Sequence, residues 1–353
     1  MLKRYKARIV RLHTQRMHRA TLDTNINDKM EGEEPTLFHF LKMSRRRNMR
    51  DIRQVRDTSG HVATTHEEIA NTFVAHFHQK YRPIGIDVVC MEALLSVIPP
   101  ADPGPYTIHL ERPITVDELH AAIKMGSRNR APGIDGISLE FYLANWESIW
   151  TDLLELFNHM FLTNNITTRQ KHGIVVCIKK EGGDMTPDGY RPITLLTNEY
   201  KILARIMAGR MRQILQDHIT SNQFCGVPER SILEAVSLVR NTIAYAETNS
   251  VPLCVLTLDF QHAFDRVSHQ HLFRVLQQYG ISDWFIARIR ALYENATASV
   301  QVNGTLVGNI HIQSAVRQGC PLSMVLYTLC LQPLLCTLEE KLSGLTLGSR
   351  RKG

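Results

Sequence analysis

A largely apolar run at residues 253–258 (LCVLTL) ends directly in Asp259. A run of this length is typical of a strand buried in the core of a sheet. A carboxylate at the end of such a strand is costly unless it is paired, hydrogen-bonded or bound to a cation. With hard oxygen ligands on offer and no Cys or His cluster nearby, the pattern favours Mg²⁺ at Asp259. The alternative is an aspartate that only caps the turn after the strand.

Composition sets the broad class of the protein. The chain has 353 residues, 44% of them apolar and 21% charged, so it can bury a sizeable core and form two or three domains. Seven scattered cysteines without a CxxC pair argue against a disulfide framework and a zinc ribbon, and favour a reducing compartment. The N-terminal residues contain no apolar signal segment. The longest apolar stretch, at 324–338, is interrupted and too short for a membrane span. We therefore expect no contact with membranes.

Positive charge is concentrated at the N-terminus. Residues 1–56 hold 15 Lys and Arg against 6 Asp and Glu, whereas the remaining residues hold 26 against 28. Such clusters can neutralise several phosphates and release their counterions, which makes nucleic acid the natural partner. The alternative is a solvated helical face that only keeps the protein soluble. The residues that we expect to contact nucleic acid are Arg45, Arg46, Arg47 and Arg50.

The predicted elements alternate between helices and strands, which indicates an α+β or α/β core. An aromatic stripe at Phe73, Phe77 and Tyr81 predicts a helix with a buried face. A linker rich in proline lies at 99–105, and the Asn303–Gly304 dipeptide predicts a type I′ hairpin. Further helices are expected at 115–124, 139–161, 200–215, 269–279 and 322–342, and a buried strand at 173–178.

Five segments carry a resemblance to a known family. They are APGIDG at 131–136, GYRPITLL at 189–196 followed by YKILA at 200–204, SNQFCGVPERS at 221–231, LDFQHAFDRV at 258–267, and RQGCPLS at 317–323. In this order they resemble the blocks of the reverse transcriptases of non-LTR retrotransposons, the long interspersed element type. The resemblance runs from about residue 30 to the end of the sequence.

The resemblance implies an α+β fold with the fingers and part of the palm of a right-hand polymerase, preceded by a basic helical segment. The implied division is a basic helical connector at 1–80, a linker at 81–110, the fingers at 111–250 and a partial palm at 251–353. The implied partners are an RNA template, a DNA primer and deoxynucleoside triphosphates. The implied location is intracellular, either nuclear or cytoplasmic.

The resemblance also implies roles for individual residues. Asp259 would coordinate two Mg²⁺ ions, or Mn²⁺, with help from the backbone carbonyl of Phe260. Phe264 would be the bulky side chain that excludes ribonucleotides. The other residues implied to bind the nucleotide are Lys179, Lys180, Arg191, Gln318 and Gly319.

The sequence departs from the family in ways that bear on activity. The family places a pair of adjacent aspartates shortly after the RQG helix, and this sequence contains no such pair. The adjacent acids Glu339 and Glu340 lie in a helical pattern and do not replace it. Smaller departures are Glu229 and Ala315, which stand where the family has glycine, and Met324, which replaces a proline. We therefore expect a chain that is truncated before the aspartate pair and inactive by itself. One alternative is a non-catalytic RNA-binding or interaction remnant, and another is a fragment with no stable fold.

Overall fold

The computed structural model describes residues 51–102 and 104–342, without the side chain of Pro105. The described residues from Gln54 onward belong to one compact unit. The four arginines at 45–50 that we expect to contact nucleic acid lie outside the described residues, as does most of the predicted basic segment.

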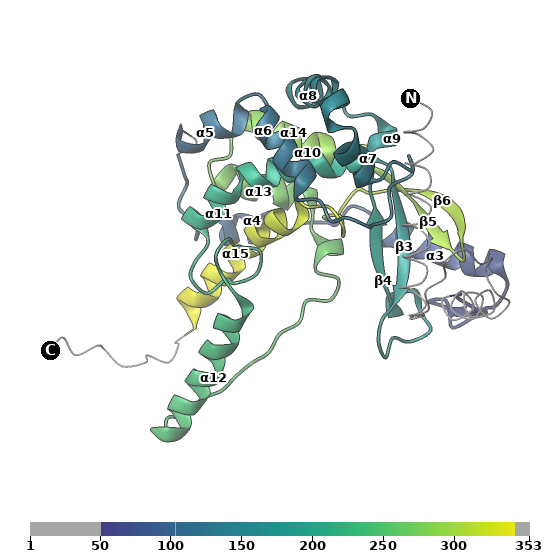
Figure 1. The fold of residues 1–353 in the computed structure, drawn as a ribbon. Coiled ribbons are helices and arrows are strands. Elements are labelled where there is room, and N and C mark those ends of the chain that lie inside the picture. The colour runs from purple at the N-terminus through teal and green to yellow at the C-terminus, as the bar shows by residue number, and fades with distance from the viewer. Residues whose placement is uncertain (1–50, 103, 343–353) are drawn as a thin grey trace, which may run out of the picture. The chain divides into compact units, whose positions relative to one another are not determined.

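A mixed sheet of four strands forms one part of this unit (Figure 1). Its order is β4 (Tyr190–Leu195), β3 (Gly173–Lys179), β5 (Thr297–Val302) and β6 (Thr305–His311). The central strand β3 runs antiparallel to β4 and parallel to β5. The mixture of helices with this sheet agrees with the α+β class expected from the sequence. A separate two-stranded ladder joins β1 (Val55–Arg56) to β2 (Val62–Ala63).

Helices account for most of the remaining described residues (Figure 1). Phe73 of helix α3 packs edge-on against Tyr190 of β4, and α3 also lies against β5 and β6. The helices are α3 (His66–Lys80), α4 (Val88–Leu95), α5 (Gly104–Glu111), α6 (Val116–Lys124), α7 (Leu139–Ala144), α8 (Trp146–Thr163), α9 (Thr168–Lys171), α10 (Asn198–Arg210), α11 (Arg212–His218), α12 (Ile232–Thr248), α13 (His269–Gln278), α14 (Asp283–Tyr293) and α15 (Ser323–Lys341). Two short 3₁₀ turns, η1 (Pro187–Gly189) and η2 (Phe264–Arg266), complete the set.

Several predicted elements are confirmed, because local sequence signals determine them. Thr115 forms the predicted capping box with Glu118 at the start of α6. Asn303 and Gly304 have φ angles of 47° and 89°, as a type I′ turn requires. Gly280 ends α13 with a φ of 69°. The helix expected at 139–161 is confirmed in part, because the structure divides it at Asn145 into α7 and α8.

Two predictions were wrong. Residues 253–258 form no strand, and residues 252–260 are exposed. A strand is stable only when a neighbour satisfies its backbone groups, and no described strand pairs with this segment. The predicted linker at 81–110 contains helices α4 and α5, and Leu95 and Leu110 are buried in the core.

The buried side chain of Arg210 joins three helices, α5, α6 and α10. Its side chain is only 2% exposed, and Glu118 accepts hydrogen bonds from Nε at 3.0 Å and from Nη2 at 2.9 Å. The carbonyls of Leu110, Arg112 and Pro113 accept from the remaining nitrogens. Because every donor direction of the guanidinium is used, this arginine holds α5 and α6 against α10.

Among the described residues, no helix is both long enough and apolar enough to cross a membrane. All seven cysteines are free thiols.

Candidate functional site

The loop that carries the RQG sequence docks onto the edge of β4. The backbone N–H of Thr194 donates to the carbonyl of Gln318 at 2.8 Å. A Cβ atom at position 319 would lie 2.6 Å from the carbonyl oxygen of Thr194, and Gly319 has a φ of 109°. Glycine is therefore required here for both the close approach and the backbone conformation. The contact brings two segments far apart in the sequence to the same place.

The hairpin of β3 and β4 carries the predicted phosphate-binding cations on two different faces. Arg191 pairs with Ile178, and the N–H of Lys180 donates to the carbonyl of Gly189. Because side chains alternate along a strand and cross-strand partners share a face, Lys180 and Arg191 lie on one face. Lys179 pairs with Tyr190 and lies on the opposite face, toward α3. All three cationic side chains are exposed.

A buried ion pair, which sequence analysis missed, links α3 to the loop after Asp259. Lys80 Nζ lies 3.0 Å from Asp265 Oδ2, and the side chains are 9% and 4% exposed. Gln318 Nε2 donates to the other oxygen of Asp265 at 3.3 Å. The signal for Lys80 was present, because it lies three residues after Phe77 on the buried stripe of the helix.

His262 extends this network to the hairpin. Its Nδ1 lies 3.1 Å from Lys80 Nζ, and its Nε2 lies 3.1 Å from Asp188 Oδ1. An ammonium group only donates, so Nδ1 accepts and the proton of the neutral ring is on Nε2, which donates to Asp188. Burial lowers the pKa of His262, and the charge of Lys80 and, more weakly, that of Lys180 act in the same direction. Lys180 thus lies within electrostatic reach of a residue three positions after Asp259.

Asp259 itself lies in the exposed segment and not at the lip of a buried strand. It lines a cavity of about 660 Å³ together with Phe260, and residues of α4 and α15 form other parts of the wall. Phe264, five positions later, stacks on Tyr327 of α15 with ring centroids 4.8 Å apart. Its carbonyl accepts from the N–H of Val316 at 2.9 Å, which ties this turn to the RQG loop.

The residues around Asp259 do not fit a complete divalent-metal site. The described residues contain no group of three or more His, Cys, Asp or Glu side chains that could hold an ion. Hard cations take six or more oxygen ligands in proteins, usually with several carboxylates when two ions are held close together. Asp259 and the carbonyl of Phe260 supply a small part of such a set.

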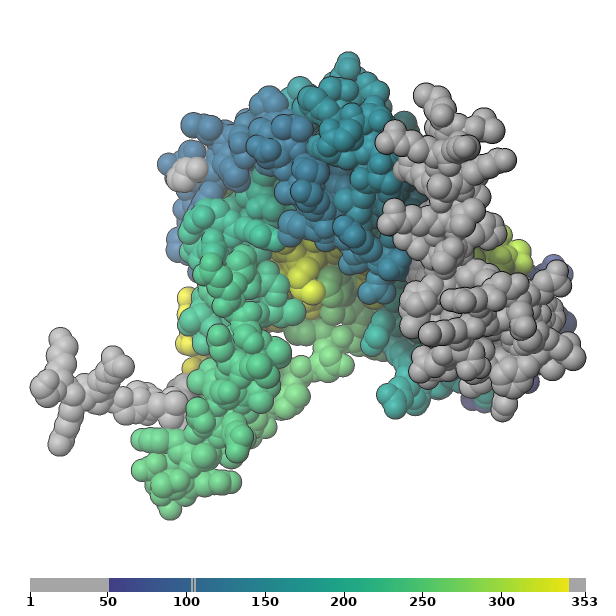
Figure 2. Space-filling model, in the orientation of Figure 1, coloured from purple at the N-terminus to yellow at the C-terminus, as the bar shows by residue number. Residues whose placement is uncertain are grey.

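A groove lies between α6, α10, the 226–229 loop and the start of α15. Its volume is about 920 Å³, and its cationic lining includes Arg112, Arg205 and Arg212. In Figure 2, yellow atoms from the last helix lie in a hollow bordered by blue and green atoms of earlier segments. Glu229 also lines the groove and brings a negative charge to it.

Comparison with known proteins identifies the family. Residues 178–348 match the family model described as reverse transcriptase (RNA-dependent DNA polymerase). The chain is 34% identical over 238 residues to the transposon TX1 uncharacterized 149 kDa protein of Xenopus laevis. The aligned residues make up 67% of this chain and 18% of that protein. The chain carries a reverse transcriptase domain of the non-LTR retrotransposon type.

Two further relatives support the assignment of this reverse transcriptase domain. One is the Pol polyprotein from the type-1 retrotransposable element R2 of Popillia japonica, 29% identical over 234 residues, which are 66% of this chain and 32% of that protein. The other is the probable RNA-directed DNA polymerase from transposon BS of Drosophila melanogaster, 24% identical over 306 residues, 85% of this chain and 33% of that protein. The chain spans between 18% and 33% of the length of these three relatives.

The two positions at which the resemblance implies a glycine, Glu229 and Ala315, share a backbone feature. Glu229 has a φ of 65° and Ala315 a φ of 86°. Both values lie in the left-handed region, which residues with a Cβ rarely adopt. Ala315 is held there because its N–H donates to Val267 at 2.7 Å and its carbonyl lies 2.9 Å from His269 Nε2.

Replacing Ala315 by glycine is expected to stabilise the domain. Relief of the left-handed conformation is worth about 1–2 kcal/mol. The extra entropy of glycine in the unfolded chain offsets about half of this gain, which leaves about 0.5–1 kcal/mol. Urea denaturation of Ala315→Gly measures this gain. Ala246→Gly is the control. Ala246 lies within helix α12, so glycine at this position should lower the free energy of unfolding by about 1 kcal/mol. A loss of stability in Ala315→Gly would contradict the prediction.

Replacing Lys80 by methionine is expected to destabilise the domain by about 3–5 kcal/mol, because Asp265 keeps a buried charge without its cation. Urea denaturation measures the loss. The double variant Lys80→Met, Asp265→Asn removes both charges and should recover most of it. Equal stability of wild type and Lys80→Met would show that the pair contributes nothing.

Proposed function

We propose that this chain forms the fingers and the first part of the palm of an RNA-directed DNA polymerase and binds the nucleotide and the template. The observation that carries the proposal is the docking of the RQG loop on β4 through Gln318 and Thr194. This contact, together with the bond from Gln318 to Asp265, brings the fingers hairpin and the loop after Asp259 to one place. In this proposal the fingers occupy 111–250 and the palm begins at 251.

The incoming deoxynucleoside triphosphate is held by Lys180 and Arg191 in this proposal. Arginine binds phosphate through two parallel hydrogen bonds and lysine binds it as a point charge. Because Lys180 and Arg191 share a face of the hairpin, both can contact the same triphosphate. Lys179 lies on the other face and is not assigned to this triphosphate. Gln318 and Gly319 border the sugar and base, and Phe264 forms the steric boundary at the 2′ position.

The RNA template lies in the groove lined by Arg112, Arg205 and Arg212 in this proposal. Positive charge along a concave surface attracts the phosphate backbone without reading its sequence. Arg45, Arg46, Arg47 and Arg50 add further phosphate contacts as sequence-based predictions. A DNA primer would share the site, and binding would take place inside the cell, in the nucleus or the cytoplasm.

Catalysis by these 353 residues alone is not part of the proposed function. A divalent metal such as Mg²⁺ would stabilise the entering and leaving oxygens of phosphoryl transfer, with Mn²⁺ as an alternative. The sequence contains no adjacent pair of aspartates to join Asp259. The chain is therefore proposed to bind its substrates without joining them, which also favours the alternative of a non-catalytic RNA-binding protein.

Primer extension tests the proposed lack of catalysis. The polypeptide of residues 1–353 is incubated with a DNA primer on an RNA template, deoxynucleotides and Mg²⁺ or Mn²⁺. We expect no extension above that of Asp259→Ala, because one carboxylate cannot hold two cations. Robust synthesis by the wild-type chain that disappears in Asp259→Ala would show that the chain is an active enzyme.

Nucleotide binding tests the assignment of the hairpin. The dissociation constant of a fluorescent deoxynucleoside triphosphate is measured in the presence of primer and template. Lys180→Gln and Arg191→Gln are each expected to weaken binding about tenfold, the usual effect of losing one charged hydrogen bond. Lys179→Gln is the matched control, since Lys179 is also exposed but lies on the opposite face, and this variant should bind as the wild type does. If all three variants bind alike, the assignment fails.

A further inference from the structure

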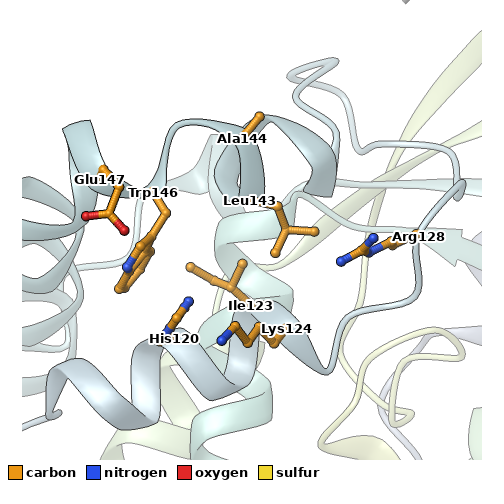
Figure 3. Close-up of a pocket in the computed structure, with 8 residues that line it drawn as sticks. All are labelled: His120, Ile123, Lys124, Arg128, Leu143, Ala144, Trp146 and Glu147. Atoms are coloured by element: carbon orange, nitrogen blue, oxygen red, sulfur yellow. The ribbon is translucent and has the colours of Figure 1, made fainter.

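A second pocket lies outside the proposed nucleotide site, between α6, α7 and the first turn of α8 (Figure 3). Its volume is about 500 Å³. None of its lining residues lines the groove or the cavity beside Asp259. We propose that this pocket binds an unpaired base of single-stranded RNA and an adjoining phosphate. The inference rests on the proposed function, because that RNA would be the strand that also occupies the groove.

Two stacked rings form one side of the pocket. His120 of α6 and Trp146 of α8 lie with ring centroids 4.4 Å apart and planes only 8° from parallel. Both side chains are partly exposed. Figure 3 shows the two rings beside Ile123, with Leu143 across the cavity. A flat aromatic stack beside an apolar wall is the surface on which proteins stack unpaired bases, and every base offers such a face.

Positive charge lines the same cavity, with Lys124 beside His120 and Arg128 at the far end from Trp146 (Figure 3). Lys124 at the end of α6 and Arg128 in the following loop line the pocket, and both side chains are exposed. Neither takes part in an ion pair among residues 51–102 and 104–342. Two exposed cations beside an aromatic stack match the alternation of phosphate and base along a single strand.

The acidic residue of the pocket fits a base better than a second phosphate. Glu147 lines the pocket next to Trp146 and away from Arg128 (Figure 3). A carboxylate repels phosphate but accepts hydrogen bonds from the amino and imino groups on the edge of a base. The division of charge therefore orients the strand, with the base toward Glu147 and the phosphate toward Lys124 and Arg128.

Packing alone explains the rings but not the cations. The stack of Trp146 on His120 also holds the start of α8 against α6, because Trp146 is packed on the core. That role would be complete without Lys124 and Arg128 at the same cavity. An apolar peptide would leave both cations without a counter-charge, so nucleic acid is the better match.

The pocket and the groove lie on opposite faces of α6. Glu118, Ala121, Ala122 and Met125 line the groove, whereas His120, Ile123 and Lys124 line the pocket. At about 100° per residue these sets are centred roughly half a turn apart on the helix. Met125, which lines the groove at the C-terminal end of α6, is 63% exposed. A strand that leaves the groove can therefore cross the end of α6 and place its next unpaired base in the pocket.

Single-stranded RNA binding tests the proposal. The probe is a mixed-sequence RNA oligonucleotide with 2-aminopurine placed at successive positions, because stacking on a ring quenches this base. The full 353-residue chain should quench at least one position. Trp146→Ala should abolish that quenching and weaken binding about tenfold, whereas Trp146→Phe should retain most of both. Trp150→Ala is the control on the same helix, and Trp150 does not line the pocket.

The charge variant decides the outcome if Trp146→Ala does not fold. Lys124→Gln with Arg128→Gln removes two exposed cations and should reduce the salt slope of binding by about 1.4. Arg240→Gln with Lys341→Gln removes two exposed cations elsewhere and should leave the slope unchanged. Wild-type affinity, quenching and salt slope in the pocket variants would overturn the proposal.

Failure of the two proposals can be told apart. If nucleotide binding does not depend on Lys180 and Arg191 but quenching still depends on Trp146, the polymerase assignment fails and the RNA pocket stands. If the hairpin variants behave as expected and Trp146 has no effect on RNA binding, only the pocket proposal fails.

Discussion

The buried contact between Lys80 and Asp265 is the interaction on which the geometry of the candidate site depends. Both side chains are removed from water, so each needs the other to offset the cost of desolvation. Asp265 uses its second oxygen to accept from Gln318, and Gln318 is fixed in turn by the N–H of Thr194. A helix near the start of the folded unit thereby helps to position a loop near its end. In the proposed function, a change at Lys80 would therefore alter the nucleotide site through Asp265 and Gln318, without a direct contact to the nucleotide.

Sequence reasoning succeeded where a structure is determined by a few neighbouring residues. The capping box at Thr115, the turn at Asn303–Gly304 and the helix end at Gly280 each follow from the chemistry of two or three side chains. The order of the motifs was enough to indicate the family. The network around Lys80 could not be found in this way, because its members come from α3, the hairpin and the loop after Asp259. Only folding brings those three segments together.

The apolar run at 253–258 shows the limit of the same reasoning. Leu256 and Leu258 remain 76% and 68% exposed, although their pattern is typical of a buried strand. The preceding helix α12 also exposes apolar side chains, including Ile232 and Leu233. Hydrophobic pattern indicates which residues gain free energy from burial, but a strand also needs a partner for its backbone groups. No described strand supplies that partner.

Substrate binding and chemistry make separate physical demands on this chain. The proposed binding features need a hairpin with two cations on one face, a loop docked by Gly319 and a cationic groove, and contacts among the described residues form all three. Phosphoryl transfer needs several carboxylates close enough to hold two cations against their mutual repulsion. Among residues 51–102 and 104–342, no strand pairs with the segment of Asp259 and no cluster of carboxylates surrounds it. In the proposed function, the recognition surface and the charge arrangement that the reaction requires are therefore separate parts, and Asp259 supplies one carboxylate of the second.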